Sequence, residues 1–313
     1  MNLALAELSR LVARRFVQLM AVLLIAAFGV TMATTVAGSH QPTTAEWERA
    51  EREVQLTQAR LEQFRQECEQ RRVSRTFCDG YLEREPRVED YLFGVFVFSH
   101  EITDLLYFMI AFLALFAFLV AASFVGAELT SGGMTNLLLW RPQRATVLGT
   151  KLATVLAAVL AVSVVASVLY TAAFYAIAQA TGVPGAVDAE FWGDLAVTVL
   201  RGIGLVLYAA AIGFGAATLG RHTAAALGLV ATYTIVWEIG ARIVFEVVET
   251  ARPEQYMLSS YIAAWMDGEL SFPERYLNDE YTLTWVHAGA VFAITLALIV
   301  GAAFATFRQR DLA

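Results

Sequence analysis

A group of charged residues lies inside apolar segments of the sequence, where charge is costly. Glu238, Arg242 and Glu246 follow one another at four-residue steps, so a helix carries all three on one face. Charges at such depth face protein or water and are paired. A rise of about 1.5 Å per residue, counted outward from a turn at Gly220, brings Arg201 to nearly the height of Glu238. We therefore predict an ion pair between Arg201 and Glu238.

Two roles are open for this intramembrane charge group, which consists of Arg201, Glu238, Arg242 and Glu246. It either lines the outward end of a substrate path or only locks two helices together. A Glu238→Gln protein that folds but is inactive indicates the path, whereas a protein that assembles poorly indicates the lock.

The only two cysteines, Cys68 and Cys78, lie in one polar segment. An even pair confined to the oxidising side of a membrane favours a disulfide, which would join the end of a helix to the turn after it. No histidine accompanies the pair, which argues against a metal site, and the cysteines are too far apart for a redox motif. A Cys68–Cys78 disulfide is the prediction.

The sequence lacks the motifs of the common enzyme classes. The stretch VLGTK has no leading glycine and no hydroxyl residue after its lysine, so it is not a phosphate-binding loop. Ser123 and Ser163 have no base at comparable depth. There is no HExxH motif, and the histidines are dispersed, at His40, His100, His222 and His287. We predict no enzymatic activity, no metal site and, because the net charge of −7 is spread over two polar stretches, no nucleic-acid partner.

Membrane-spanning helices have to position these residues. The chain of 313 residues is 58% hydrophobic and 16% charged, more apolar than a water-soluble domain. Six segments are long enough to cross a bilayer as helices, roughly residues 16–37, 105–126, 152–180, 202–220, 224–248 and 283–307. They are continuous and rich in Ala and Leu, unlike the alternating strands of a barrel. The predicted fold is an all-α integral membrane protein with six transmembrane helices.

Basic residues in the short connections predict the orientation of these helices. They gather before the first span, after the second, after the fourth and after the sixth, at Arg10, Arg14, Arg15, Arg141, Arg144, Lys151, Arg221, Arg308 and Arg310. An even number of spans puts all of these groups on one side, which the positive-inside rule makes cytoplasmic. The connection at residues 182–194 is acidic and faces outward. Both termini are therefore predicted to be cytoplasmic.

The residues before the first span have an amphipathic pattern. One face of a helix would hold Leu5, Leu8, Leu11 and Val12, and another would hold Glu7, Arg10 and Arg14. This pattern suits a helix that lies in the inner membrane interface, although a plain extension of the first span fits nearly as well. A signal peptide cleaved near Ala37 is a further alternative.

Two polar segments are predicted to lie outside. In the first, apolar residues recur at steps of three and four after Thr43 and Thr44, which predicts a helix over residues 44–72 that packs on another helix, a second copy or its own loop. The second contains Tyr256, Met257 and Trp265 among acidic residues, which predicts a short helix that dips into the outer leaflet or remains an ordinary loop helix. In the fourth span, the small residues Ala209, Gly213 and Ala217 predict a packing interface.

The predicted organisation has five parts. Residues 1–37 form the interfacial helix and the first span, residues 38–104 the outer helical insertion, residues 105–249 spans two to five, residues 250–282 the second outer segment, and residues 283–313 the last span and a cytoplasmic tail.

A polar stretch, VGAELTSGGMTNLLLWRPQRATVLGTK, interrupts the apolar sequence between the second and third spans. A glutamate is followed by glycines, two leucines, a proline, an arginine and a lysine, at Glu128, Gly132, Gly133, Leu137, Leu138, Pro142, Arg144 and Lys151. Together with six spans, an interfacial helix and the ending FRQRDL, this order resembles the permease subunit of ATP-binding-cassette (ABC) exporters of the type-2 class. The resemblance covers most of the chain, and the long outer insertion departs from the commonest pattern.

The resemblance implies a coupling helix at residues 130–140 that docks on a separate cytoplasmic ATPase. The implied coupling residues are Glu128, Gly132, Gly133, Leu137, Leu138, Trp140, Arg141 and Arg144. Leu137, Leu138 and Trp140 offer an apolar face for a partner, and Pro142 ends the helix. A membrane-surface helix without a partner is the alternative. The resemblance also implies two ATPases that hold ATP and Mg²⁺, a second copy or a homologous permease, and no cofactor on this chain.

The function expected from the resemblance is that of an exporter permease in a bacterial plasma membrane. A non-transporting signalling or mechanotransmission subunit, acting through the outer helix, is the alternative from a different class. The substrate is open between a drug, a peptide, a lipid and a glycan.

Overall fold

Six long apolar helices make up most of the chain. The computed structural model describes residues 3–71, 86–134, 139, 143–274 and 280–309. The six helices are α2 (Arg15–Gly38), α5 (Phe98–Thr130), α7 (Arg144–Thr181), α8 (Ala189–Gly220), the segment Thr223–Val247 and α12 (Trp285–Gln309). With 24 to 38 residues, each is long enough to cross the roughly 30 Å hydrocarbon core of a bilayer. The predicted all-α membrane fold with six spans is confirmed.

The chain divides into two compact units. The first comprises residues 1–27, 105–168 and 193–313, and the second comprises residues 28–104 and 169–192. The first unit contains most of α5, α7 and α8 together with the last two spans, and the second contains the long polar helix α3 (Thr44–Arg71).

The amino-terminal residues of the first unit form a separate helix, α1 (Leu3–Val12), which ends before α2 begins at Arg15. It is therefore not a plain extension of the first span. Leu5, Leu8 and Val12 are exposed, whereas Glu7 and Leu11 are buried. The exposed apolar face suits a membrane interface. Glu7, which was predicted to lie on the polar face, is instead buried against protein.

The small residues of α8 pack against α5 in the first unit. Gly213 and Ala217 are buried and Ala209 is partly buried, which confirms the predicted packing interface. A Cβ atom on Gly213 would lie 2.6 Å from the backbone oxygen of Phe118 in α5. This backbone contact has no flexible side chain that can move aside, so the site requires glycine.

Gly213→Val is expected to destabilise the protein by about 1–3 kcal/mol, since α5 and α8 must separate to admit the side chain. Gly301→Val in α12 is the matched control, because nothing lies within 4 Å of a Cβ at that position. Thermal unfolding in detergent measures both variants. Equal midpoints for the two would contradict the close α5–α8 contact.

The fifth span is not a uniform α-helix. It consists of α9 (Thr223–Thr232), the π-helical segment η2 (Tyr233–Ala241) and α10 (Arg242–Val247). In a π-helix, backbone hydrogen bonds join residues five positions apart, so the turn is wider than in an α-helix. Tyr233 accordingly donates a hydrogen bond to Glu238, at 2.8 Å. The prediction that Glu238, Arg242 and Glu246 share one face assumed a uniform α-helix, whereas Glu238 lies in the π-helical segment and Arg242 begins the next α-helix.

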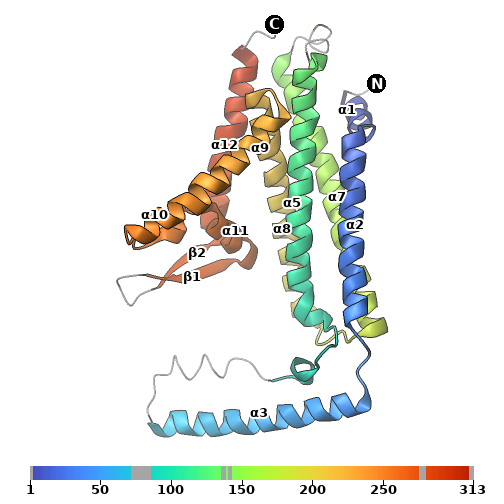
Figure 1. Ribbon diagram of the computed structural model, residues 1–313, viewed down its shortest axis with the longest axis vertical. Helices are drawn as coiled ribbons and strands as arrows, with labels where there is room; N and C mark the ends of the chain where they lie inside the picture. Colours follow the sequence, from blue (N-terminus) through green and yellow to red (C-terminus); the bar gives the residue numbers. More distant parts are fainter. Residues whose placement is uncertain (1–2, 72–85, 135–138, 140–142, 275–279, 310–313) are drawn as a thin grey trace. The chain divides into compact units, whose positions relative to one another are not determined.

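The second polar segment of the first unit folds into a helix and a hairpin (Figure 1). The helix α11 (Leu258–Asp267) follows the short turn η3 (Pro253–Tyr256) and confirms the predicted short helix. The strands β1 (Glu269–Pro273) and β2 (Glu280–Thr284), which the sequence analysis did not predict, pair antiparallel with Glu269 opposite Thr284. α11 packs against α12 and both strands.

In the second unit, α3 packs on its own loop. Ala50 of α3 is buried with Leu92 and Val95, next to the short helix η1 (Val88–Tyr91), and Tyr91 donates a hydrogen bond to Thr57. The predicted helix is confirmed. Of the three packing alternatives, its first half packs on its own loop rather than on another long helix or a second copy of the chain. The Glu46 carboxylate accepts hydrogen bonds from the backbone and side chain of Thr43, which lower its pKa to about 2.

Candidate functional site

A buried cluster of charged side chains lies in the first unit. Lys151 Nζ is 2.5 Å from Glu7 Oε2 and 2.6 Å from Glu128 Oε2. Arg14 Nη2 is 2.7 Å from Glu128 Oε1, and Arg10 is 3.2 Å from Glu7. The side chains of Lys151 and Glu7 are 0% and 1% exposed. We call Glu7, Arg14, Glu128 and Lys151 the charge cluster.

Charge balance and contact with an aromatic ring offset the cost of burying the charge cluster. Two cations meet two carboxylates in the charge cluster, so the buried net charge is zero. Lys151 Nζ and the Arg14 guanidinium lie 4.9 Å and 4.8 Å from the centre of the Phe124 ring, within cation–π distance. Arg14 also donates to the backbone oxygen of Ser123, at 3.1 Å. A paired, desolvated cluster of this kind resists the removal of any one member.

The charge cluster fastens together the two ends of the predicted coupling segment. Glu128 lies in the last turn of α5, which ends at Thr130, and Lys151 lies in the second turn of α7, which begins at Arg144. Their direct contact holds these helix ends side by side. Glu7 adds α1 to the same junction. One set of buried contacts therefore links α1, α5 and α7.

The glycines after Glu128 turn the chain, as their sequence position suggests. Gly132 has a φ of +72°, a left-handed conformation that glycine adopts without strain. Gly133 follows it, and Met134 is buried, with 1% of its side chain exposed. Leu137, Leu138, Trp140 and Arg141 lie outside the described residues, so the coupling helix at residues 130–140 stays a prediction. Leu139, within the same stretch, is 79% exposed.

Glu7 was missed as a functional residue, although the sequence contains a signal for it. Lys151 is the only lysine of the chain and follows the polar stretch into an apolar span. A lysine at such a position needs a carboxylate partner. Glu128 was visible as one candidate, but the contact with Glu7 joins residues 144 positions apart and no local pattern indicates it.

The predicted ion pair between Arg201 and Glu238 is not formed, although the structure describes both residues. Arg201 Nη1 donates to the backbone oxygen of Met266, at 3.2 Å, and Glu238 accepts from the backbone and hydroxyl of Ser259, at 3.1 Å and 2.7 Å. Ser259 and Met266 lie at opposite ends of α11. The short helix comes between the two charges, and each binds one of its ends.

The signs of the two charges match the dipole of α11. The carboxylate of Glu238 lies at the amino end, where free N–H groups carry positive partial charge, and the Arg201 guanidinium lies at the carboxyl end. Gly268 ends the helix with a φ of +98°, and a Cβ atom there would approach the guanidinium to 3.0 Å. Trp265 completes the contact by donating to the Arg201 backbone oxygen, at 2.8 Å.

The remaining predicted site residues lie elsewhere. Arg242 and Glu246 are on α10 and line a small cavity of about 120 Å³ with Pro253, Glu254 and Met257. Cys68 is close to the end of α3, but Cys78 lies outside the described residues, so the disulfide stays a prediction.

The fold and the charge cluster define a multi-pass membrane protein in which buried ion pairs join the ends of two spanning helices. A family model described as ABC-2 family transporter protein matches residues 1–312. The chain therefore belongs to the ABC-2 transporter family and is a membrane permease of an ABC transporter. Membership of this family implies association with an ABC ATPase. No curated protein and no solved structure matches the sequence.

Proposed function

We propose that this chain is the permease of an ATP-driven exporter and that it receives energy from a separate cytoplasmic ATPase at residues 130–140. The observation that carries the proposal is the charge cluster, which joins the two stems of that segment through the contact of Lys151 with Glu128. The apolar residues Leu137, Leu138 and Trp140 supply the docking surface.

In this proposal, two permeases work with two ATPases that bind ATP and Mg²⁺. When the ATPases close, they displace residues 130–140. The contacts among Glu7, Glu128 and Lys151 make α1, α5 and α7 respond together, because separating them would leave charges buried without partners. The helices then switch the access of the substrate path.

The orientation follows from the basic residues. Arg10, Arg144 and Arg308 belong to the groups that the positive-inside rule assigns to the cytoplasm. The ATPase then meets residues 130–140 on the inside, and the polar segment that contains α3 lies on the outside of a bacterial plasma membrane.

Co-purification tests the coupling. Leu137→Asp/Leu138→Asp is expected to reduce the amount of ATPase recovered with the permease by at least about tenfold, because two carboxylates replace an apolar contact. Ala145→Asp/Thr146→Asp is the matched control, since both residues are exposed in the first turn of α7 and gain the same charge. The proposal fails if no ATPase accompanies the native protein or if both variants retain it equally.

A second candidate function rests on α3. This helix of 28 residues is about 42 Å long and carries charged residues on its exposed face. A non-transporting subunit would use it to act on an outside partner. In that case, the reconstituted complex hydrolyses ATP without moving solute, and charge reversal at Arg52 and Arg60 abolishes the outside response while ATP hydrolysis continues.

A further inference from the structure

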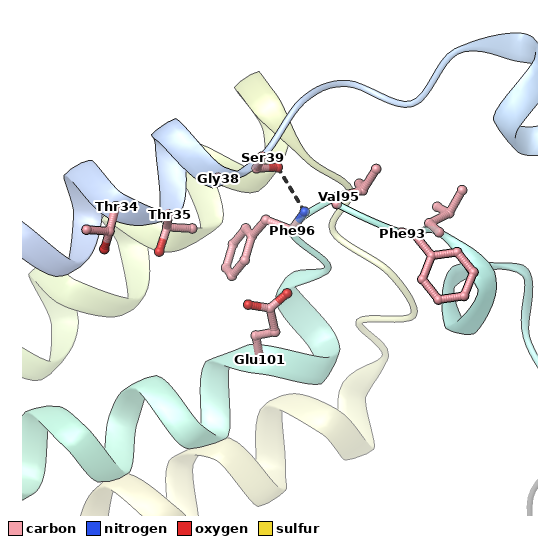
Figure 2. Close-up of a pocket in the computed structure, with 10 residues that line it drawn as sticks. Thr34, Thr35, Gly38, Ser39, Phe93, Val95, Phe96 and Glu101 are labelled. Atoms are coloured by element: carbon pink, nitrogen blue, oxygen red, sulfur yellow. Dashed lines mark hydrogen bonds between the residues drawn. The ribbon is translucent and has the colours of Figure 1, made fainter.

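An open pocket lies in the second unit, at the ends of two spanning helices. It has a volume of about 460 Å³, within the range of small-molecule sites. Its wall consists of Thr34, Thr35, Gly38 and Ser39 at the end of α2, residues 92–96 of the loop before α5, and Glu101 in the first turn of α5. Figure 2 shows the Glu101 carboxylate directed toward the loop that carries Val95 and Phe96.

The loop wall is held in place by Ser39. Its hydroxyl accepts a hydrogen bond from the backbone N–H of Phe96, at 2.8 Å (Figure 2). It also donates to the backbone oxygen of Thr181, at 2.6 Å. One side chain therefore joins the end of α2, the loop and the end of α7. The pocket is formed before any ligand arrives.

The side-chain polar atoms of the pocket are available as acceptors. The hydroxyl protons of Thr34 and Thr35 are used within α2, in hydrogen bonds to the backbone oxygens of Val30 and Thr31. The proton of Ser39 is used as well. What remains for a ligand is oxygen lone pairs and the Glu101 carboxylate, which can only accept when ionised.

Glu101 has no ion-pair partner among the described residues. The histidine next to it, His100, lies 3.3 Å from Asp90, and His40, which follows Ser39 in the chain, lies 3.1 Å from Glu46. Glu101 interacts with the backbone of Val97 and, electrostatically, with the neighbouring His100, whose ion-pair contact is with Asp90. Its negative charge is therefore available to a ligand.

The remaining wall is apolar. Leu92, Val95 and Phe96 are buried and give a rigid surface, whereas Phe93 is 85% exposed at the edge of the pocket. A ligand that fits this wall has an apolar part in addition to its positive charge. The exposed aromatic ring also favours a cation.

We propose that this pocket binds a primary ammonium group attached to an apolar chain. Glu101 pairs with the ammonium, the threonine and serine oxygens accept its other protons, and the apolar chain lies against residues 92–96. A free alkylamine and the ethanolamine headgroup of a lipid have this chemistry in common. The pocket's function is separate from coupling to the ATPase.

Calorimetric titration of the purified protein in phosphatidylcholine nanodiscs with n-octylammonium tests the proposal, with empty nanodiscs subtracted. Saturable binding is expected, and n-octanol is expected to bind at least about tenfold more weakly. Glu101→Gln is expected to weaken octylammonium binding by about 10–100-fold. Asp104→Asn, one turn along α5 and outside the pocket wall, removes the same charge and is expected to change binding less than about threefold.

Gly38→Leu provides a second variant that leaves Glu101 intact. Gly38 lines the pocket and nothing lies within 4 Å of a Cβ there, so a leucine fits without a clash. It is expected to narrow the pocket and weaken binding at least about tenfold without a loss of helix content by circular dichroism. Phosphatidylethanolamine in the nanodiscs competes with octylammonium if the lipid headgroup is the ligand and has no effect if a free amine is. The proposal is overturned by equal effects of Glu101→Gln and Asp104→Asn, by equal binding of octanol, or by no binding above empty nanodiscs. No ATPase is needed, so these results are independent of the proposed transport function.

Discussion

Lys151→Met is expected to lower the free energy of unfolding by about 3–5 kcal/mol and to abolish ATP-driven transport. The substitution keeps most of the apolar stem but removes the charge that Glu7 and Glu128 share. Glu7, which is 1% exposed, then faces only Arg10 on the protein surface. The Glu7 carboxylate is then buried without adequate charge compensation. Denaturant unfolding in detergent micelles measures the loss of stability.

Arg10→Met is the matched control for Lys151→Met. Arg10 pairs with the same Glu7 at 3.2 Å, but its side chain is 53% exposed, so water replaces it with a change of about 0–1 kcal/mol. A double variant, Glu7→Leu with Lys151→Met, is expected to be more stable than Lys151→Met alone, because no buried charge is left unpaired at α1. Equal stability of Lys151→Met and Arg10→Met would contradict the buried arrangement.

Glu238→Ala is expected to open α11 locally. The substitution removes the acceptor of the Ser259 backbone and hydroxyl and of the Tyr233 hydroxyl. Hydrogen bonds to a charged acceptor each contribute about 1.5–3 kcal/mol, so amide exchange in residues 258–267 is expected to accelerate by at least about tenfold. Hydrogen-exchange mass spectrometry of the purified protein measures it.

Two further variants test whether the effect of Glu238→Ala comes from the loss of charge at one end of α11. Arg201→Met, which frees the other end of α11, is expected to accelerate exchange in the same residues. Asp194→Ala, which removes an exposed carboxylate from the helix that carries Arg201, is expected to leave it unchanged. Protection of α11 in all three variants would rule out the role assigned to these charges and reopen a direct pairing of Arg201 with Glu238.

Most of the fold could be predicted from the length and apolar content of the helical segments. The six spans and α3 are visible in the sequence because a run of apolar residues, or a repeat at steps of three and four, is a local property. The strands β1 and β2 were missed because each has only five residues and lies next to α11 or α12, whose helical pattern dominates that part of the sequence.

The site was harder to predict because its contacts are not local. The wrong pairing of Arg201 with Glu238 assumed a uniform α-helix, and neither the π-helical turn at Tyr233 nor the position of α11 between the charges follows from residue spacing. Glu7 was assigned to a polar face because carboxylates usually face water. Its burial depends on Lys151, which lies far along the chain.

The burial of Lys151 provides a way to detect the opening of the charge cluster by chemical modification. Because this lysine is the only one in the sequence and is 0% exposed, amine-directed reagents find no accessible lysine while the charge cluster is closed. Modification of Lys151 therefore measures how often α1, α5 and α7 separate. The rate of Lys151 modification, compared with and without nucleotide in the assembled transporter, measures how fast this junction opens. No residue has to be introduced to carry the modification.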